Sequence, residues 1–123
     1  MPQPDFQIKV GDNASSIFAT LEDAAGTPVD IEAATVKFRM APISGGAAVL
    51  EAAATNAQNG SGTSDHSVGN VSYAWVPGTA GTLGDTDTAG FYLGEWEVTY
   101  ASGTVETFPN GGYVLIEVTE ALA

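Results

Sequence analysis

The chain has 123 residues, which is enough for one domain with one hydrophobic core, so we expect a single domain over residues 1–123. Its composition, 44% hydrophobic and 15% charged, is typical of a folded protein and argues against disorder. The formal net charge of -12 disfavours nucleic acid and anionic membranes as partners, and the absence of cysteine excludes disulfides and thiolate-bound metals.

Strand patterns occupy the first half of the chain. Apolar residues recur at every second position in residues 6–10, 17–21 and 36–40, which is the period of a half-buried strand. A weaker strand is expected at residues 49–53, and residues 29–31 are expected to cross between two sheets. The small polar residues that follow, 56–69, predict a loop.

The second half repeats the pattern with clearer alternation. Residues 71–75 predict a strand, and residues 78–90 predict a long loop rich in Gly, Thr and Asp. In residues 91–100, Tyr92, Trp96, Val98 and Tyr100 share one face and Glu95, Glu97 and Thr99 the other. The second run has Val114, Ile116 and Val118 on one face and Leu115, Glu117 and Thr119 on the other. The glycines and proline of residues 102–112 predict a bend between them.

Together these runs predict an all-β fold, an immunoglobulin-like β-sandwich of about seven to eight antiparallel strands. An eight-stranded barrel is the structural alternative. In the sandwich, Lys37 and Arg39 lie on the outer face of one strand and face Glu95 and Glu97 on its neighbour. We therefore predict cross-strand ion pairs, each contributing about 0.2–1 kcal/mol at a solvated surface.

Ordered blocks covering almost the whole chain are similar to one known family. They include DFQIKVGD at residues 5–12, ATVKFRM at 34–40 and EWEVTY at 95–100. The remaining blocks are residues 21–23, 26–31, 69–75, 89–92, 103, 107–110 and 113. In this order and spacing the chain resembles the immunoglobulin-like N-terminal module of the phage baseplate upper protein family.

The resemblance implies a virion structural protein, assembled in the host cytoplasm. In that family the module attaches a longer receptor-binding protein to the particle, whereas this chain ends at Ala123, directly after its last strand. We therefore expect a stand-alone module of the tail, baseplate or connector that binds neighbouring virion proteins and copies of itself. A capsid decoration protein and a carbohydrate-binding or receptor-binding domain are the alternatives.

Two polar motifs were weighed as sites. His66, the only histidine, lies between Asp65 and Ser67, but consecutive side chains in a loop cannot converge as a catalytic triad, so we interpret it as a solvated loop residue. Residues 85–88, Asp-Thr-Asp-Thr, offer carboxylates to calcium, yet they lack the glycine and distal glutamate of an EF-hand loop. A turn held by Asp and Thr side chains is the preferred interpretation.

The aromatic residues suggest a sugar platform only if they are exposed. Trp75 and Trp96 lie on the inner faces of their predicted strands, so core packing is favoured. A glycosidase would need two carboxylates flanking a cleft, whereas Glu95 and Glu97 share one flat, solvated strand face.

We therefore assign no catalytic, cofactor-binding or metal-binding residues and expect no enzyme activity. The absence of a signal peptide pattern or a long apolar segment predicts folding in a cytoplasm and no membrane contact. Contacts to partners are expected at both ends and in the two long loops, namely residues 1–5, 56–70, 78–90 and 118–123.

Overall fold

The computed structural model describes residues 3–31, 33–46, 49–53, 55–56, 69–109 and 111–122. All regular secondary structure in these ranges is β-strand, which confirms the all-β prediction. The same ranges contain no helix with the length and apolar composition that crossing a bilayer requires. The strands are β1 (Phe6–Lys9), β2 (Ser16–Thr20), β3 (Thr35–Pro42), β4 (Leu50–Ala53), β5 (Thr55–Asn56), β6 (Asn70–Ala74), β7 (Gly90–Thr99), β8 (Val105–Phe108) and β9 (Val114–Thr119).

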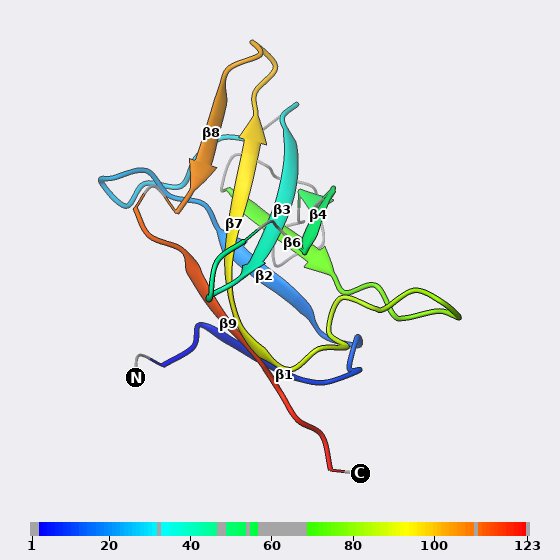
Figure 1. The fold of residues 1–123 in the computed structure, drawn as a ribbon. Helices are drawn as coiled ribbons and strands as arrows, with labels where there is room; N and C mark the ends of the chain where they lie inside the picture. The colour runs from blue at the N-terminus through cyan, green and yellow to red at the C-terminus, as the bar shows by residue number, and fades with distance from the viewer. Residues whose placement is uncertain are drawn as a thin grey trace.

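The strands form two separate sheets, so the chain is a sandwich rather than a barrel. The six-stranded sheet has the order β1-β9-β7-β3-β4, with β8 also paired to β7, and the three-stranded sheet has the order β2-β6-β5. Figure 1 shows the three-stranded sheet crossing obliquely behind β7 and β3. Residues 29–31 connect β2 in one sheet to β3 in the other, as expected for a crossing segment. The immunoglobulin-like assignment stays a prediction.

Strand β7 is the central element of the larger sheet. It pairs with β3 along almost its whole length, from Tyr92 opposite Pro42 to Thr99 opposite Thr35. On its other edge the first half of β7 pairs with β9 and the second half with β8. The bend predicted for residues 102–112 therefore contains a strand, β8, because Val105 to Phe108 extend back along β7 before the chain turns into β9.

The prediction of antiparallel strands is wrong for one pair. Strand β1 runs parallel to β9, with Phe6 opposite Ile116 and Lys9 opposite Thr119. A hairpin turn forces its two strands to be antiparallel, but β1 and β9 are separated by nearly the whole chain, so no turn sets their direction. The other strand pairs in the described ranges are antiparallel.

The core lies between the two sheets and follows the alternation of the strands. In β7, Tyr92, Gly94, Trp96 and Val98 are buried, whereas the odd-numbered residues between them are half-buried on the opposite face. Trp75 and Trp96 are only 3% and 1% exposed, which confirms the predicted core position of both indoles. The other large buried side chains come from both sheets and their connections: Ile8, Ile17, Leu21, Ile31, Val36, Phe38, Met40, Val71, Tyr73, Phe108, Ile116 and Val118.

At Gly94 the core has no space for a side chain. It lies on the inner face of β7, and a Cβ atom there would be 2.9 Å from Cδ1 of Ile116 and 3.2 Å from the ring of Phe38. The Phe38 ring is fully buried between aromatic neighbours, so it has no space to move away. The position therefore requires glycine for steric reasons rather than for an unusual backbone conformation.

We predict that Gly94→Ala lowers the free energy of unfolding by about 1–3 kcal/mol, because the added methyl group overpacks the core. Urea denaturation followed by tryptophan fluorescence measures the change. The control is Gly111→Ala, since a Cβ atom at Gly111 would meet no heavy atom within 4 Å. Equal unfolding midpoints for the two variants would contradict this account of the core.

Candidate interaction surfaces

The acidic residues of the 78–90 loop accept hydrogen bonds from the end of β6, from the residues after it and from the loop itself. Oδ2 of Asp85 accepts hydrogen bonds from the Tyr73 hydroxyl at 2.6 Å and from the Val76 backbone N–H at 2.8 Å. Oδ2 of Asp87 accepts one from the Gly84 N–H at 2.6 Å. These bonds agree with the turn interpretation of residues 85–88, because each carboxylate is used to cap the chain nearby.

Thr86 fixes the same loop to the end of β1. It is 3% exposed, and its hydroxyl donates to the carbonyl oxygen of Asp12 at 2.8 Å. Its own carbonyl oxygen accepts from the Gly11 N–H at 3.0 Å. No group of three or more His, Cys, Asp or Glu residues within the described ranges is placed to hold a metal ion. The base of this loop is therefore anchored at several points.

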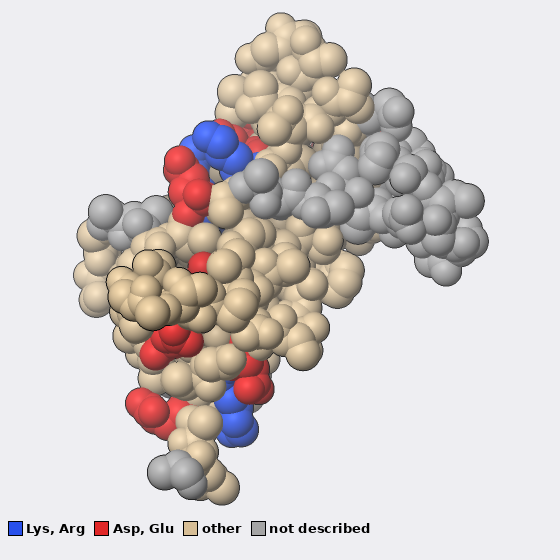
Figure 2. Space-filling view, turned by 90° about the vertical axis from the view of Figure 1, so that its right-hand side faces the viewer, with Lys and Arg blue, Asp and Glu red and all other residues tan. Residues whose placement is uncertain are grey.

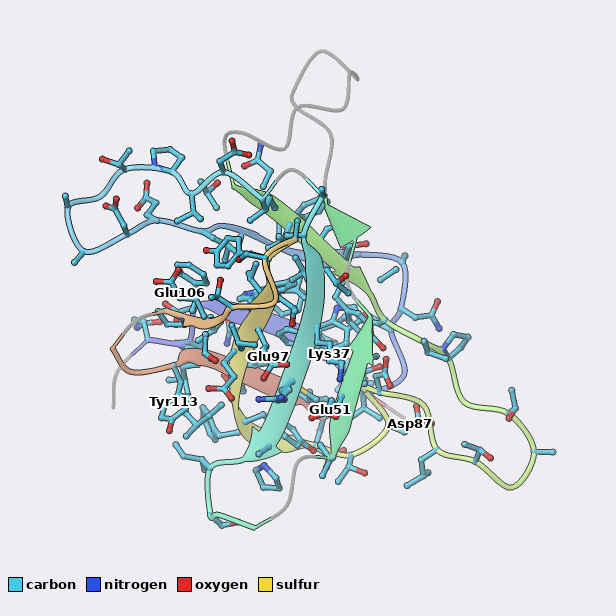
Figure 3. All side chains as sticks on the ribbon, turned by 90° about the horizontal axis from the view of Figure 1, so that it is seen from above. Lys37, Glu51, Asp87, Glu97, Glu106 and Tyr113 are labelled. Carbon is cyan, nitrogen blue, oxygen red and sulfur yellow. The ribbon has the colours of Figure 1, made fainter. Side chains whose placement is uncertain are left out.

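A charged cluster crosses three strands on the outer face of the six-stranded sheet. Nη2 of Arg39 lies 2.6 Å from Oε2 of Glu97, and Nη1 lies 3.5 Å from Oε1 of Glu95. Both carboxylates come from β7, which is adjacent to β3, so the predicted cross-strand pairing is confirmed for Arg39. Figure 3 shows Lys37, Glu51 and Glu97 on these neighbouring strands.

The cluster differs from the prediction at two residues. Nε of Arg39 also lies 2.7 Å from Oε2 of Glu51 on β4, a partner that the sequence did not suggest. Lys37 is opposite Glu97 in the strand register, but within the described residues it makes no ion pair shorter than 4.0 Å. Arg39, rather than Lys37, binds these glutamates, because its planar guanidinium has several N–H groups and can bind three carboxylates at once.

A hollow with an apolar rim lies where the β3–β4 connection approaches the 78–90 loop. Its volume is about 490 Å³, and its walls include Leu50, Phe91 and Tyr92. Three large aliphatic side chains around it are exposed: Ile43 at 56%, Val49 at 60% and Leu83 at 75%. Alternation of residue types does not predict this hollow, because its walls come from residues far apart along the chain.

The structure describes only part of the expected contact segments. Residues 3–5, 78–90 and 118–122 are described, whereas 1–2, 57–68 and 123 lie outside the described residues, and His66 falls among these. In the 78–90 loop, Leu83 comes directly before the anchored residues 84–87 and is 75% exposed. Near the C-terminus Leu122 is 99% exposed.

The aromatic residues do not form a stacking platform. Tyr73, Trp75, Tyr92 and Trp96 are all buried, and Tyr100 donates a hydrogen bond to Oε1 of Glu106 at 2.8 Å. Phe18 and Tyr113 are exposed, but Phe18 belongs to the three-stranded sheet and Tyr113 precedes β9 in the other sheet. The two candidate glycosidase carboxylates, Glu95 and Glu97, both bind Arg39.

Comparison with known proteins found no match: neither a protein-family model, nor a curated protein, nor a solved structure is similar to this chain.

Burial raises the pKa of three tyrosines. The pKa of Tyr73 is raised by burial and by its hydrogen bond to Asp85, and the pKa of Tyr92 is raised by burial. Burial, with the hydrogen bond to Glu106, raises the pKa of Tyr100 to about 12. In each case the fold favours the neutral phenol over the phenolate.

We predict that replacing Arg39 destabilises the sheet through its three carboxylate neighbours. Arg39→Ala should lower the free energy of unfolding by about 1 kcal/mol at low ionic strength, because three glutamates then repel one another without a cation. Lys37→Ala is the matched control on the same strand and should have a smaller effect. The loss is measured by urea denaturation at increasing sodium chloride. The loss of unfolding free energy in Arg39→Ala should become smaller as salt screens the repulsion between the glutamates. A loss no larger than that of Lys37→Ala would refute the stabilising role of the cluster.

We predict a loss of thermal stability at alkaline pH. An unfolded tyrosine has a pKa of about 10, so these tyrosines contribute their full stabilisation below that pH and lose it as pH rises toward their raised folded values. The melting temperature should therefore fall between about pH 10 and pH 12, and Tyr100→Phe should reduce that fall. Spectrophotometric titration of the phenolate measures the same pKa values independently. If all tyrosines titrate like free tyrosine, the raised pKa values of the three buried tyrosines are contradicted.

Proposed function

We propose that this chain is a structural protein of a bacteriophage virion, an immunoglobulin-like module of the tail, baseplate or connector that binds neighbouring virion proteins and copies of itself. The blocks that carry the family resemblance support this proposal, because they coincide with the framework of the fold. Residues 5–12 include β1, residues 34–40 include most of β3, and residues 95–100 include the second half of β7.

The observation that carries the proposal is that polar side chains of the loops are held in internal contacts, while large apolar side chains are exposed. Polar side chains that chemistry would need are used in internal contacts, as Asp85, Thr86 and Asp87 show. Eight large apolar side chains are nevertheless exposed among the described residues, and exposed apolar side chains are what surfaces that bind other proteins offer. These exposed residues are Phe18, Ile43, Val49, Val76, Leu83, Val105, Tyr113 and Leu122.

Their placement at strand ends and in loops suits assembly into a larger particle. Ile43, Val49 and Leu83 surround one hollow, and Val105 begins β8. A module present in many copies can be held by weak contacts, because multivalency adds them together. A capsid decoration protein would use the same contacts at a different place in the particle. The buried indoles of Trp75 and Trp96 give no support to the carbohydrate-binding alternative.

The test is whether the protein is a stoichiometric component of the particle. Particles are purified on a density gradient from the phage or induced culture whose genome encodes the chain, and their proteins are quantified by mass spectrometry. We expect the chain in the particle at a fixed ratio to known tail proteins that persists after high-salt washing. Its absence from particles, or its removal by washing, would refute the proposal, and a ratio set to the capsid protein would instead favour the decoration alternative.

A further inference from the structure

The positive charges of this protein are gathered on one surface. The odd-numbered positions of β1, β3, β4, β7, β8 and β9 face away from the core, and we call this surface the outer face of the six-stranded sheet. Lys9 on β1 and Lys37 and Arg39 on β3 all belong to it. These are the three lysines and arginines of the whole sequence.

The outer face is consequently close to neutral in a strongly acidic protein. Four carboxylates share it with the three cations, namely Glu51, Glu95, Glu97 and Glu117. Its formal charge is therefore -1 in a chain whose net charge is -12, and it holds every lysine and arginine of the sequence. In Figure 2 the visible blue groups lie beside red ones.

The centre of the same face is apolar. Leu93 on β7 is opposite Leu115 on β9 and also opposite Ala41 on β3, so three neighbouring strands place apolar side chains side by side. All three are half-buried. Ile43 and Tyr113, each 56% exposed, follow and precede this strip along the chain. An apolar centre with a polar, charged margin is the usual composition of a protein interface.

Charge complementarity identifies the partner as a second copy of the chain. The strands of the three-stranded sheet contain no charged residue, so of the two sheet faces only the outer face can pair charges of both signs with its own copy. On the outer face, Lys9 and Lys37 make no ion pair shorter than 4.0 Å within the described residues, so both cations can bind carboxylates of a partner. A two-fold axis brings the same surface of each copy together, which makes those pairings mutual.

We infer that the outer face of the six-stranded sheet binds the same face of a second copy across a two-fold axis. The two sheets would pack face to face about 10 Å apart, with the apolar strips interdigitating at the centre. The inference rests on that part of the proposed function in which the protein binds copies of itself, and it assigns the surface that does so.

The test is the oligomeric state of the full chain in solution, measured by analytical ultracentrifugation over a range of protein concentrations. We expect a reversible dimer. Leu115→Glu, which adds a charge to the apolar strip, should raise the dimer dissociation constant about tenfold or more. The matched control is Phe18→Glu, which adds the same charge to an exposed position on the three-stranded sheet and should leave the dimer unchanged.

A second variant keeps the test decisive if Leu115→Glu fails to fold. Lys37→Glu replaces an exposed side chain that has no ion pair among the described residues, so the fold should tolerate it. It makes the outer face more acidic, and the dimer should weaken at low salt and recover in part as sodium chloride is added. Melting curves confirm that each variant is folded.

The outcomes separate this inference from the proposed function. A wild-type protein that stays monomeric at every concentration, or a folded Lys37→Glu or Leu115→Glu variant that dimerises like the wild type, overturns the inference. Dissociation by Phe18→Glu alone would move the interface to the other sheet and overturns it too. A monomer that is still incorporated into particles would leave the virion assignment standing, whereas a dimer that is absent from particles would refute only that assignment.

Discussion

The packing of Phe38 against aromatic rings of both sheets is the contact on which the rest of the structure depends. Its ring centroid lies 4.7 Å from that of Trp96 in the same sheet, and 5.3 Å and 6.0 Å from those of Tyr73 and Trp75 across the interface. Such pairs contribute about 0.5–1.5 kcal/mol each beyond the area they bury. Some sandwiches have a disulfide that joins the two sheets, but this chain has no cysteine. Here the aromatic cluster joins them.

The same contact determines the outer surface, because the side chains of a strand alternate. A slip of one residue in β3 would move Phe38 to solvent and Arg39 into the core, so burial of the ring fixes the register of the strand. With that register, Arg39 lies opposite Glu95 and next to Glu97 and Glu51. The ion pairs are therefore a consequence of the core, and they refine an arrangement that apolar packing has already selected.

The alternation of residue types was sufficient to predict whatever depends on burial. It placed Trp75 and Trp96 in the core, and only together with the expected sandwich topology did it place Arg39 beside the β7 glutamates. Features that depend on contacts between distant segments were not predictable in this way. The parallel β1–β9 pair, the strand β8 and the contacts of Glu51 each require knowledge of which strands are neighbours, and the side-chain period of one strand contains no such information.

The 78–90 loop is likewise positioned by contacts to the core. Tyr73 belongs to the aromatic core, yet its hydroxyl binds Asp85, so the 78–90 loop is attached directly to the packing between the sheets. The loop's carboxylates Asp85 and Asp87 therefore already accept hydrogen bonds from donors of the chain itself. What the fold leaves available is the distribution of charge and apolar area over its exterior. Core packing also decides where the cations lie, because the register that buries Phe38 puts Lys37 and Arg39 on the outer face of the six-stranded sheet, and the pairing of β1 with β9 puts Lys9 there too.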